Sequence, residues 1–152
     1  MKYIKVSKGK QVIVDDDIYD FLNQWKWYCS SNGYAVRNEY HPGHRTIRMH
    51  VLVNNTPPGF FTDHINGNKL DNRRSNLRTC TKNENGFNRA KPANNTSGYK
   101  GIYWHNRDRC WRVQLRVGGK KKYIGNYASI DDAILARNKA ALTYHGGFAK
   151  LD

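Results

Sequence analysis

The chain has 152 residues, enough for one ordinary domain or two small ones, and 26 lysines and arginines against 12 aspartates and glutamates give it a net charge of +14. This excess points to DNA, RNA or an anionic membrane surface, but no apolar run could span a membrane and the N-terminus lacks a secretion signal, so we expect a cytoplasmic protein with no membrane partner. Cys29, Cys80 and Cys110 lack paired spacing, so neither a disulfide framework nor a structural zinc site is expected.

Residues 1–53 consist of short alternating runs separated by turn signals, a pattern typical of short strands and hairpins. One or two helical turns are expected over 17–22, and Trp25 and Trp27 should anchor the small core.

Residues 54–91 are polar and rich in asparagine, with one clear helix start. Thr81 is followed three residues later by Glu84, a capping-box pattern that predicts a short helix over about 82–90. Proline, glycine and small polar residues then predict a linker over 92–98.

Residues 99–152 carry the most regular pattern of the chain. Apolar and polar residues alternate over 110–117, and Gly118-Gly119 is a two-residue hairpin turn. Ser129 then caps a helix. We therefore predict a three-stranded antiparallel sheet packed on one helix. The buried stripe of this helix is expected to comprise Ile130, Ala133, Ile134, Ala140, Ala141 and Tyr144.

The positive charge is concentrated in the middle of the chain. Residues 69–91 carry seven basic and two acidic residues, and residues 92–122 carry eight basic and one acidic. On the predicted sheet the face away from the helix is basic, and its charges are interleaved with aromatic and aliphatic residues, which favours a nucleic-acid interface. An ordinary solvated surface is the alternative. The basic set comprises Lys100, Arg112, Arg116 and Lys121.

The segment from Asp63 to Asn85 carries the candidate chemistry. Hydrolysis of a phosphodiester needs a base near neutral pH, which His64 can supply, and a cation that neutralises the charge building on the phosphoryl oxygens. Asp63 and Asn85 offer oxygen ligands, and two protein ligands suit Mg²⁺, which keeps several waters and uses substrate phosphate for the rest. Taken singly, each residue is also consistent with a turn or surface position.

Residues 47–90 resemble the HNH nuclease family, whose core is a ββα-metal fold. The resemblance lies in the strand 47–53, in the pattern D-H-I-N-G-N-x-x-D-N-R-x-x-N-L-R that begins at Asp63, and in the T-x-x-E-N that follows. It implies one divalent metal ion, Mg²⁺ ahead of Mn²⁺, and no structural zinc.

The same resemblance implies a role for each site residue. His64 would be the general base, and Asp63 and Asn85 would be metal ligands. Asn76 would hold the active-site loop and orient His64. His50 either supports the site or is an ordinary strand residue, and both interpretations stay open.

Residues 97–151 resemble the plant ethylene-response-factor (Apetala-type) DNA-binding domain, in which a three-stranded sheet lies in the major groove. The matching segments include Gly98 to Ile102, Trp111 to Arg116 and Tyr123 to Tyr127. The sequence departs from the plant pattern between Tyr103 and Arg109, so the plant target sequence is not carried over. By position the resemblance implies DNA contacts at Lys100, Gln114, Arg116, Lys121 and Tyr123, to which the alternation alone adds Arg112.

We therefore expect an α+β protein with a β-rich region and HNH core in residues 1–91, a linker over 92–98 and a sheet-and-helix domain over 99–152. The expected activity is metal-dependent cleavage of double-stranded DNA by a homing-type endonuclease of a phage or bacterium, in the cytoplasm and without an obligate protein partner. A non-catalytic, sequence-specific DNA-binding regulator with a vestigial nuclease site is the alternative. An RNA-binding protein is favoured less, because a sheet fits the major groove of B-form DNA better than that of A-form RNA.

Overall fold

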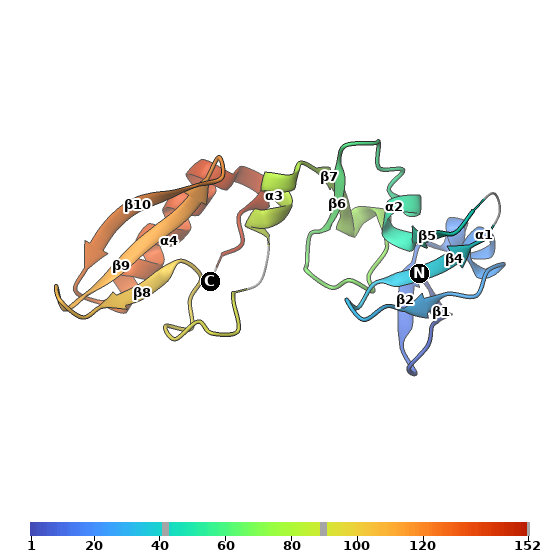
Figure 1. The fold of residues 1–152 in the computed structure, drawn as a ribbon, viewed down its shortest axis with the longest axis horizontal. Helices are drawn as coiled ribbons and strands as arrows, with labels where there is room; N and C mark the ends of the chain where they lie inside the picture. Colours follow the sequence, from blue (N-terminus) through green and yellow to red (C-terminus); the bar gives the residue numbers. More distant parts are fainter. Residues whose placement is uncertain (41–42, 89–90, 152) are drawn as a thin grey trace. The chain divides into compact units, whose positions relative to one another are not determined.

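The structure, a computed structural model, describes residues 1–40, 43–88 and 91–151 (Figure 1). The chain forms two compact units, Met1–Lys82 (the first unit) and Asn83–Asp152 (the second unit). Both helices and small antiparallel sheets are present, so the α+β class is confirmed. In the described part of the chain, no helix is long and apolar enough to cross a membrane.

The first unit consists of a β1-β2 hairpin, a three-stranded sheet in the order β3-β4-β5 and a β6-β7 hairpin. Short helices connect them. The elements are β1 (Lys2–Lys5), β2 (Gln11–Val14), η1 (Asp16–Ile18), α1 (Tyr19–Asn23), β3 (Tyr28–Cys29), β4 (Ala35–Glu39), β5 (Arg45–Arg48), α2 (Met49–Val53), β6 (Phe61–His64), η2 (Arg74–Asn76) and β7 (Leu77–Cys80).

One apolar core joins these elements. Val12, Val14 and Leu22 are completely buried in it, with Trp27 5% exposed and Trp25 packed against the cluster. The indole Nε1 of Trp27 donates a hydrogen bond to the carbonyl of Leu22 at 2.8 Å, which satisfies its one polar atom. The expectation that the two tryptophans anchor this core is confirmed.

The predicted strand over 47–53 is wrong. The strand ends at Arg48, and Met49–Val53 is the helix α2. Met49, His50 and Val53 are buried while Val51 and Leu52 are more than a third exposed, a helical rather than an alternating pattern of burial. A short apolar run cannot distinguish the two structures, because either one can bury it.

The second unit is a three-stranded antiparallel sheet in the order β10-β9-β8 with one long helix, α4, lying along it (Figure 1). The strands and the Gly118-Gly119 turn match the prediction, and both turn glycines have positive φ. The elements are α3 (Lys82–Phe87), which starts at the last residue of the first unit, then β8 (Ile102–His105), β9 (Cys110–Val117), β10 (Lys120–Tyr127), α4 (Ile130–His145) and η3 (Gly146–Phe148).

The helix predicted over 82–90 starts where expected, but α3 ends at Phe87. Residues 89 and 90 of that prediction lie outside the described residues. Residues 92–98, the predicted linker, contain turns and bends but no helix or strand.

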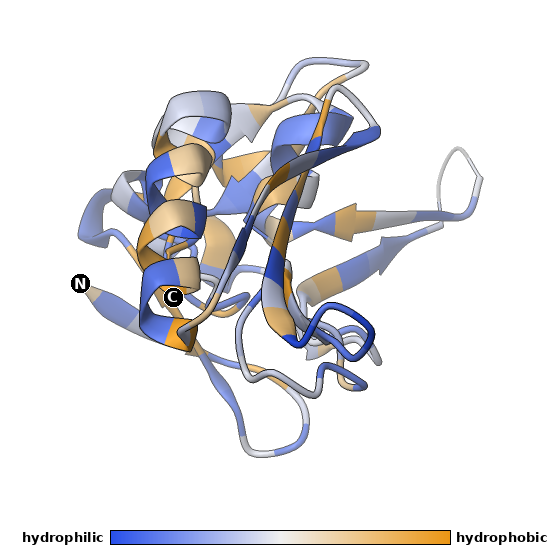
Figure 2. Ribbon diagram, turned by 90° about the vertical axis from the view of Figure 1, so that its left-hand side faces the viewer, coloured by the Kyte–Doolittle hydropathy of each residue, from blue (hydrophilic) through white to orange (hydrophobic). Residues whose placement is uncertain are grey.

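The helix α4 carries both hydrophobic and hydrophilic residues along its length (Figure 2). Its Ser129 cap is confirmed, since the hydroxyl accepts a hydrogen bond from the amide of Asp132 at 3.1 Å. Ala133, Ala140 and Ala141 are buried as expected, but Tyr144 is exposed. The place of a large apolar side chain is taken by Arg137, which is only 1% exposed and donates from Nε to the carbonyl of Lys100 at 3.0 Å.

Candidate active site

The β6-β7 hairpin brings together the residues of the D-H pattern. β6 ends on Asp63 and His64, which lie opposite Arg78 and Leu77 of β7. Both side chains are buried, 6% and 5% exposed. Successive residues of a strand point to opposite faces, so the carboxylate and the imidazole have different neighbours.

The carboxylate of Asp63 pairs with the guanidinium of Arg78 across the hairpin. Arg78 donates from Nε at 2.9 Å and from Nη2 at 2.7 Å to Oδ2 of Asp63. A buried carboxylate needs such compensation for its lost hydration. This ion pair was not predicted, although a charged pair directly opposite in a hairpin is a recognisable signal once the register is known.

His64 is held by Asn72 of the connecting loop. Nε2 of His64 lies 2.8 Å from Oδ1 of Asn72, which is completely buried. An amide oxygen only accepts hydrogen bonds, so Nε2 carries the proton and the lone pair of the neutral ring lies on Nδ1. Burial lowers the pKa of His64, and the hydrogen bond to Asn72 partly opposes this effect. The histidine is therefore neutral, the form that can accept a proton.

The loop between β6 and β7 is fixed by side-chain amides. Oδ1 of Asn76 accepts from the amide of Asn66 at 3.0 Å, and Nδ2 donates to the carbonyl of Asp71 at 2.8 Å. Arg73 binds both carboxylate oxygens of Asp71, at 2.8 and 2.7 Å, and holds the pKa of that carboxyl below its usual value. The side chain of Asn76 thus spans the loop, and the imidazole of His64 is hydrogen-bonded to Asn72.

The loop is also attached to the N-terminal hairpin. The amide of Ile13 in β2 donates to the carbonyl of Leu70, and the amide of Asn72 donates to the carbonyl of Ile13, both at 2.8 Å. Asn72 is therefore fixed through its backbone as well as its side chain, and so is the ring of His64 that it contacts.

Aromatic rings enclose His64 on another side. The ring of His50, on α2, lies 5.0 Å from that of His64 and 4.7 Å from that of Tyr34, measured between centroids. Nδ1 of His50 is buried with no hydrogen-bond partner among the described residues. Burial, together with the proximity of the His64 ring and the Arg48 guanidinium, lowers the pKa of His50 to about 3. Lys69 places Nζ 4.8 Å from the Tyr34 ring.

Asn85 lies on α3, half-buried, within the second unit. Its assignment as a second metal ligand accordingly stays a prediction.

On the second unit, the outer sheet face carries the predicted DNA contacts. Arg116 lies opposite Lys121, and Gln114 lies opposite Tyr123. A bulge between Tyr123 and Gly125 turns Ile124 inward, where it packs against the core.

Two members of the basic set have partners within the unit. Arg112 is bound to Asp108 at 2.8 Å and to Oδ1 of Asn126 at 3.1 Å. Lys100, which precedes β8, donates from Nζ to the carbonyl of Phe87 at 2.8 Å.

Comparisons with known proteins address the same segments. Residues 44–87, which contain α2 and the β6-β7 hairpin, match the HNH endonuclease family. The chain is 30% identical over 147 residues to "Uncharacterized HNH endonuclease L560" of Acanthamoeba polyphaga mimivirus, covering 94% of this chain and 75% of that protein. The chain belongs to the HNH endonuclease family.

A second relative of this HNH protein is "Protein 3.8" of Escherichia phage T7, 31% identical over 122 residues, or 76% of this chain and 98% of that protein. No solved structure matches the chain significantly. The family match ends at residue 87, so the resemblance of residues 97–151 to the ethylene-response-factor domain stays a prediction.

The β6-β7 hairpin with its connecting loop, hereafter the HNH hairpin, carries donor groups that suit a hard divalent cation. Asp63 supplies carboxylate oxygen, and Mg²⁺ needs only one or two protein carboxylates. No group of three or more His, Cys, Asp or Glu side chains with metal-binding geometry occurs among the described residues.

Proposed function

We propose that this HNH protein is a metal-dependent DNA endonuclease, site-specific and homing-like, whose catalytic base is His64. The observation that carries the proposal is the buried Asp63-His64 pair at the end of β6, inside the segment that matches the HNH endonuclease family. The neutral imidazole and the adjacent carboxylate supply the proton acceptor and the oxygen ligand that phosphodiester hydrolysis needs.

In the proposed mechanism, Nδ1 of His64 removes a proton from the water that attacks phosphorus. Asn72 keeps the ring in the tautomer with Nδ1 as acceptor and fixes its orientation through the 2.8 Å hydrogen bond. Asn76 holds the loop on which Asn72 stands. The P–O3′ bond breaks and the leaving 3′ oxygen takes a proton from solvent water, which leaves a 5′-phosphate and a 3′-hydroxyl.

Asp63, with Asn85, would hold one divalent cation, Mg²⁺ ahead of Mn²⁺. When bound, that cation would neutralise the charge that builds on the phosphoryl and leaving oxygens. Arg78 already neutralises the Asp63 carboxylate, so it positions this ligand and competes for its charge. His50 and Tyr34 would exclude water from the far side of the His64 ring.

We propose that the second unit supplies DNA binding. One face of the sheet carries Arg112, Gln114, Arg116, Lys121 and Tyr123, and Lys100 lies just before β8. The positive charge of such a surface attracts the phosphate backbone. Because the chain contains one HNH hairpin, nicking of a single strand is the expected product.

The test is incubation of supercoiled plasmid with the purified chain, with Mg²⁺ and with a chelator. Conversion to the relaxed form only with Mg²⁺ supports the proposal. Linear product indicates a double-strand cutter. Unchanged plasmid that is nevertheless bound would favour the non-catalytic DNA-binding regulator, and cleavage in the chelator would refute metal dependence.

A further inference from the structure

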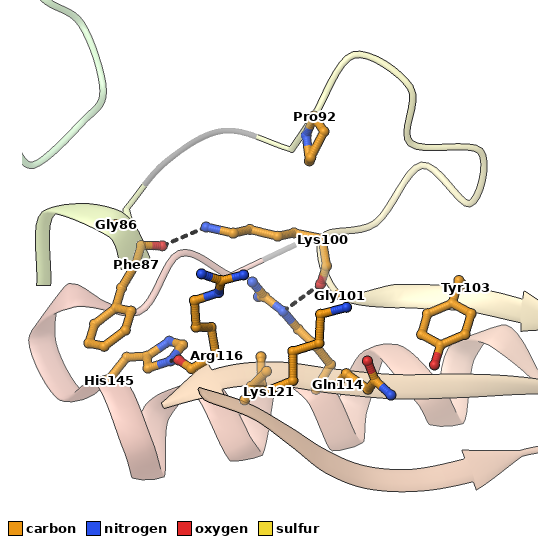
Figure 3. Close-up of a pocket in the computed structure, with 12 residues that line it drawn as sticks. Gly86, Phe87, Pro92, Lys100, Gly101, Tyr103, Gln114, Arg116, Lys121 and His145 are labelled. Atoms are coloured by element: carbon orange, nitrogen blue, oxygen red, sulfur yellow. Dashed lines mark hydrogen bonds between the residues drawn. The ribbon is translucent and has the colours of Figure 1, made fainter. Parts of the chain in front are cut away.

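The second unit contains a hollow of about 400 Å³ at one edge of its basic face (Figure 3). The side chains of Arg116, Gln114 and Lys121 point into it from β9 and β10. Phe87 at the end of α3 and Pro92 line it from the other side.

The hollow exists because β8 is shorter than β9. The pairing of the two strands ends at Ile102 and Val113, and a single further hydrogen bond joins the amide of Gln114 to the carbonyl of Gly101 at 2.9 Å. Beyond that point, no strand among the described residues covers the edge of β9. The ring of Phe87 stacks on that of His145 of α4, with centroids 3.8 Å apart. The result is a recess rather than a flat sheet edge.

The charge of the lining selects an anion. None of the described lining residues is acidic, whereas Lys100, Arg116 and Lys121 are cationic. In the described part of the chain neither Arg116 nor Lys121 forms a salt bridge, in contrast to Arg112, which is paired with Asp108. Two adjacent cations without an acidic partner repel each other, so an anion between them is stabilised.

The rest of the lining selects a flat, largely apolar group that carries hydrogen-bonding edges. Phe87, Pro92 and Leu115 contribute apolar surface, and the Gln114 amide offers both a donor and an acceptor. A purine or pyrimidine base has this combination, and base edges are what Gln and Arg side chains bind in nucleic acids.

We propose that the hollow binds a single unpaired nucleotide of the DNA substrate. The base lies against the apolar lining with its edge toward Gln114 and Arg116, and its phosphate contacts Lys121. This inference rests on the proposed DNA substrate but not on cleavage. A base inside a stacked duplex cannot enter a recess of this size, whereas an extruded or unpaired nucleotide can.

The experiment measures the affinity of the full chain in chelator, where no metal-dependent cleavage occurs, for three duplexes of one sequence. The first is fully paired, the second has one unpaired nucleotide, and the third has an abasic residue at that bulge. We expect the second to bind about tenfold more tightly than the first, because one stacked base contributes about that much. The abasic duplex should lose most of the gain, which separates base binding from the easier bending of any bulged duplex.

A matched pair of variants locates the effect. Arg116→Ala removes a charge from the lining, so the ratio of the affinities for the bulged and the fully paired duplex should fall close to one. Lys120→Ala removes an equal charge from outside the hollow and should keep the preference. Equal affinity for all three duplexes, an unchanged preference in Arg116→Ala, or a preference lost equally in both variants would overturn the inference. A chain that keeps the preference but never cuts plasmid would refute the nuclease and leave the hollow intact.

Discussion

At the residue scale, the contact between His64 and Asn72 determines which ring nitrogen can accept a proton. We predict that His64→Ala lowers the cleavage rate by at least about 100-fold, the usual contribution of a general base. DNA affinity should change little, since the ring is buried within the hairpin. The measurement is single-turnover nicking beside equilibrium binding, and near-normal turnover in the variant would remove His64 from the mechanism.

Asp63 and Asn85 should differ in how their loss responds to metal. Asn85→Ala loses a neutral ligand, so raising the Mg²⁺ concentration should restore much of the rate. Asp63→Ala loses the charged ligand and removes the carboxylate that Arg78 binds, so its rescue should be poorer. The check is the nicking rate as a function of Mg²⁺. An equal loss that is independent of metal in both variants would mean that these residues act structurally.

His50 makes stability depend on pH. Burial lowers its pKa to about 3 in the folded chain, so as the pH falls below 6.5 the unfolded chain takes up the proton first. Its contribution is therefore fully present above about pH 6.5 and is lost as the pH falls toward 3, by at most about 1.4 kcal/mol per pH unit. Denaturant unfolding between pH 7.5 and 5 tests this, and His50→Leu should show the shallower decline.

The sequence indicated which residues of the site would take part in the chemistry, but not which residues hold them in place. Asp63 and His64 stand in a compact pattern, and a β6-β7 hairpin does present them at a strand end. Asn72 and Arg78 were missed, because their roles depend on a loop conformation and a strand register that no spacing encodes.

At the element scale, prediction succeeded where one periodicity extended over eight residues and failed where the pattern was short. β9 alternates over its whole length, with Val113 and Leu115 buried, and no helix could produce that order. The five residues of α2 are too few for their pattern to distinguish a helix from a strand. Arg137 was missed for another reason, since an arginine is rarely buried unless backbone carbonyls are there to receive it.

Gly101, just before β8, is required by its backbone. Its φ is +79°, and a Cβ there would lie 2.4 Å from the carbonyl oxygen of Gln114. We predict that Gly101→Ala destabilises the second unit by about 1–3 kcal/mol. Gly86→Ala is the control, because a Cβ there meets nothing within 4 Å inside α3, and it should be neutral or slightly stabilising. The measurement is the free energy of unfolding of both variants, followed through the fluorescence of Trp104 and Trp111. Equal stability of the two variants would contradict the proposed need for glycine at position 101.

At the scale of the whole molecule, the proposed roles are divided between two compact units. The first contains the buried HNH hairpin, and the second contains a sheet whose outer face is basic. Apart from Asn85, a proposed metal ligand that lies in the second unit, such a division would allow cutting and binding to be impaired separately by substitutions in the first and the second unit. The ionic-strength dependence of DNA affinity is then the property that belongs to the second unit.

The basic face should show three different behaviours when its charges are removed singly. Each phosphate contact contributes about −0.9 to the slope of log affinity against log salt, so Lys121→Ala should weaken binding to all sequences and flatten the slope by about one unit. Arg116→Ala should cost about 1–3 kcal/mol on a preferred site and little elsewhere, as expected of a base contact. Arg112→Ala should change either quantity least, because Asp108 and Asn126 already engage its guanidinium. The measurement is binding of each variant, in chelator, to a selected site and to random duplex at several salt concentrations. If all three variants bound both duplexes like the parent chain, the face would be ordinary solvated surface, and DNA recognition would have to reside in the first unit.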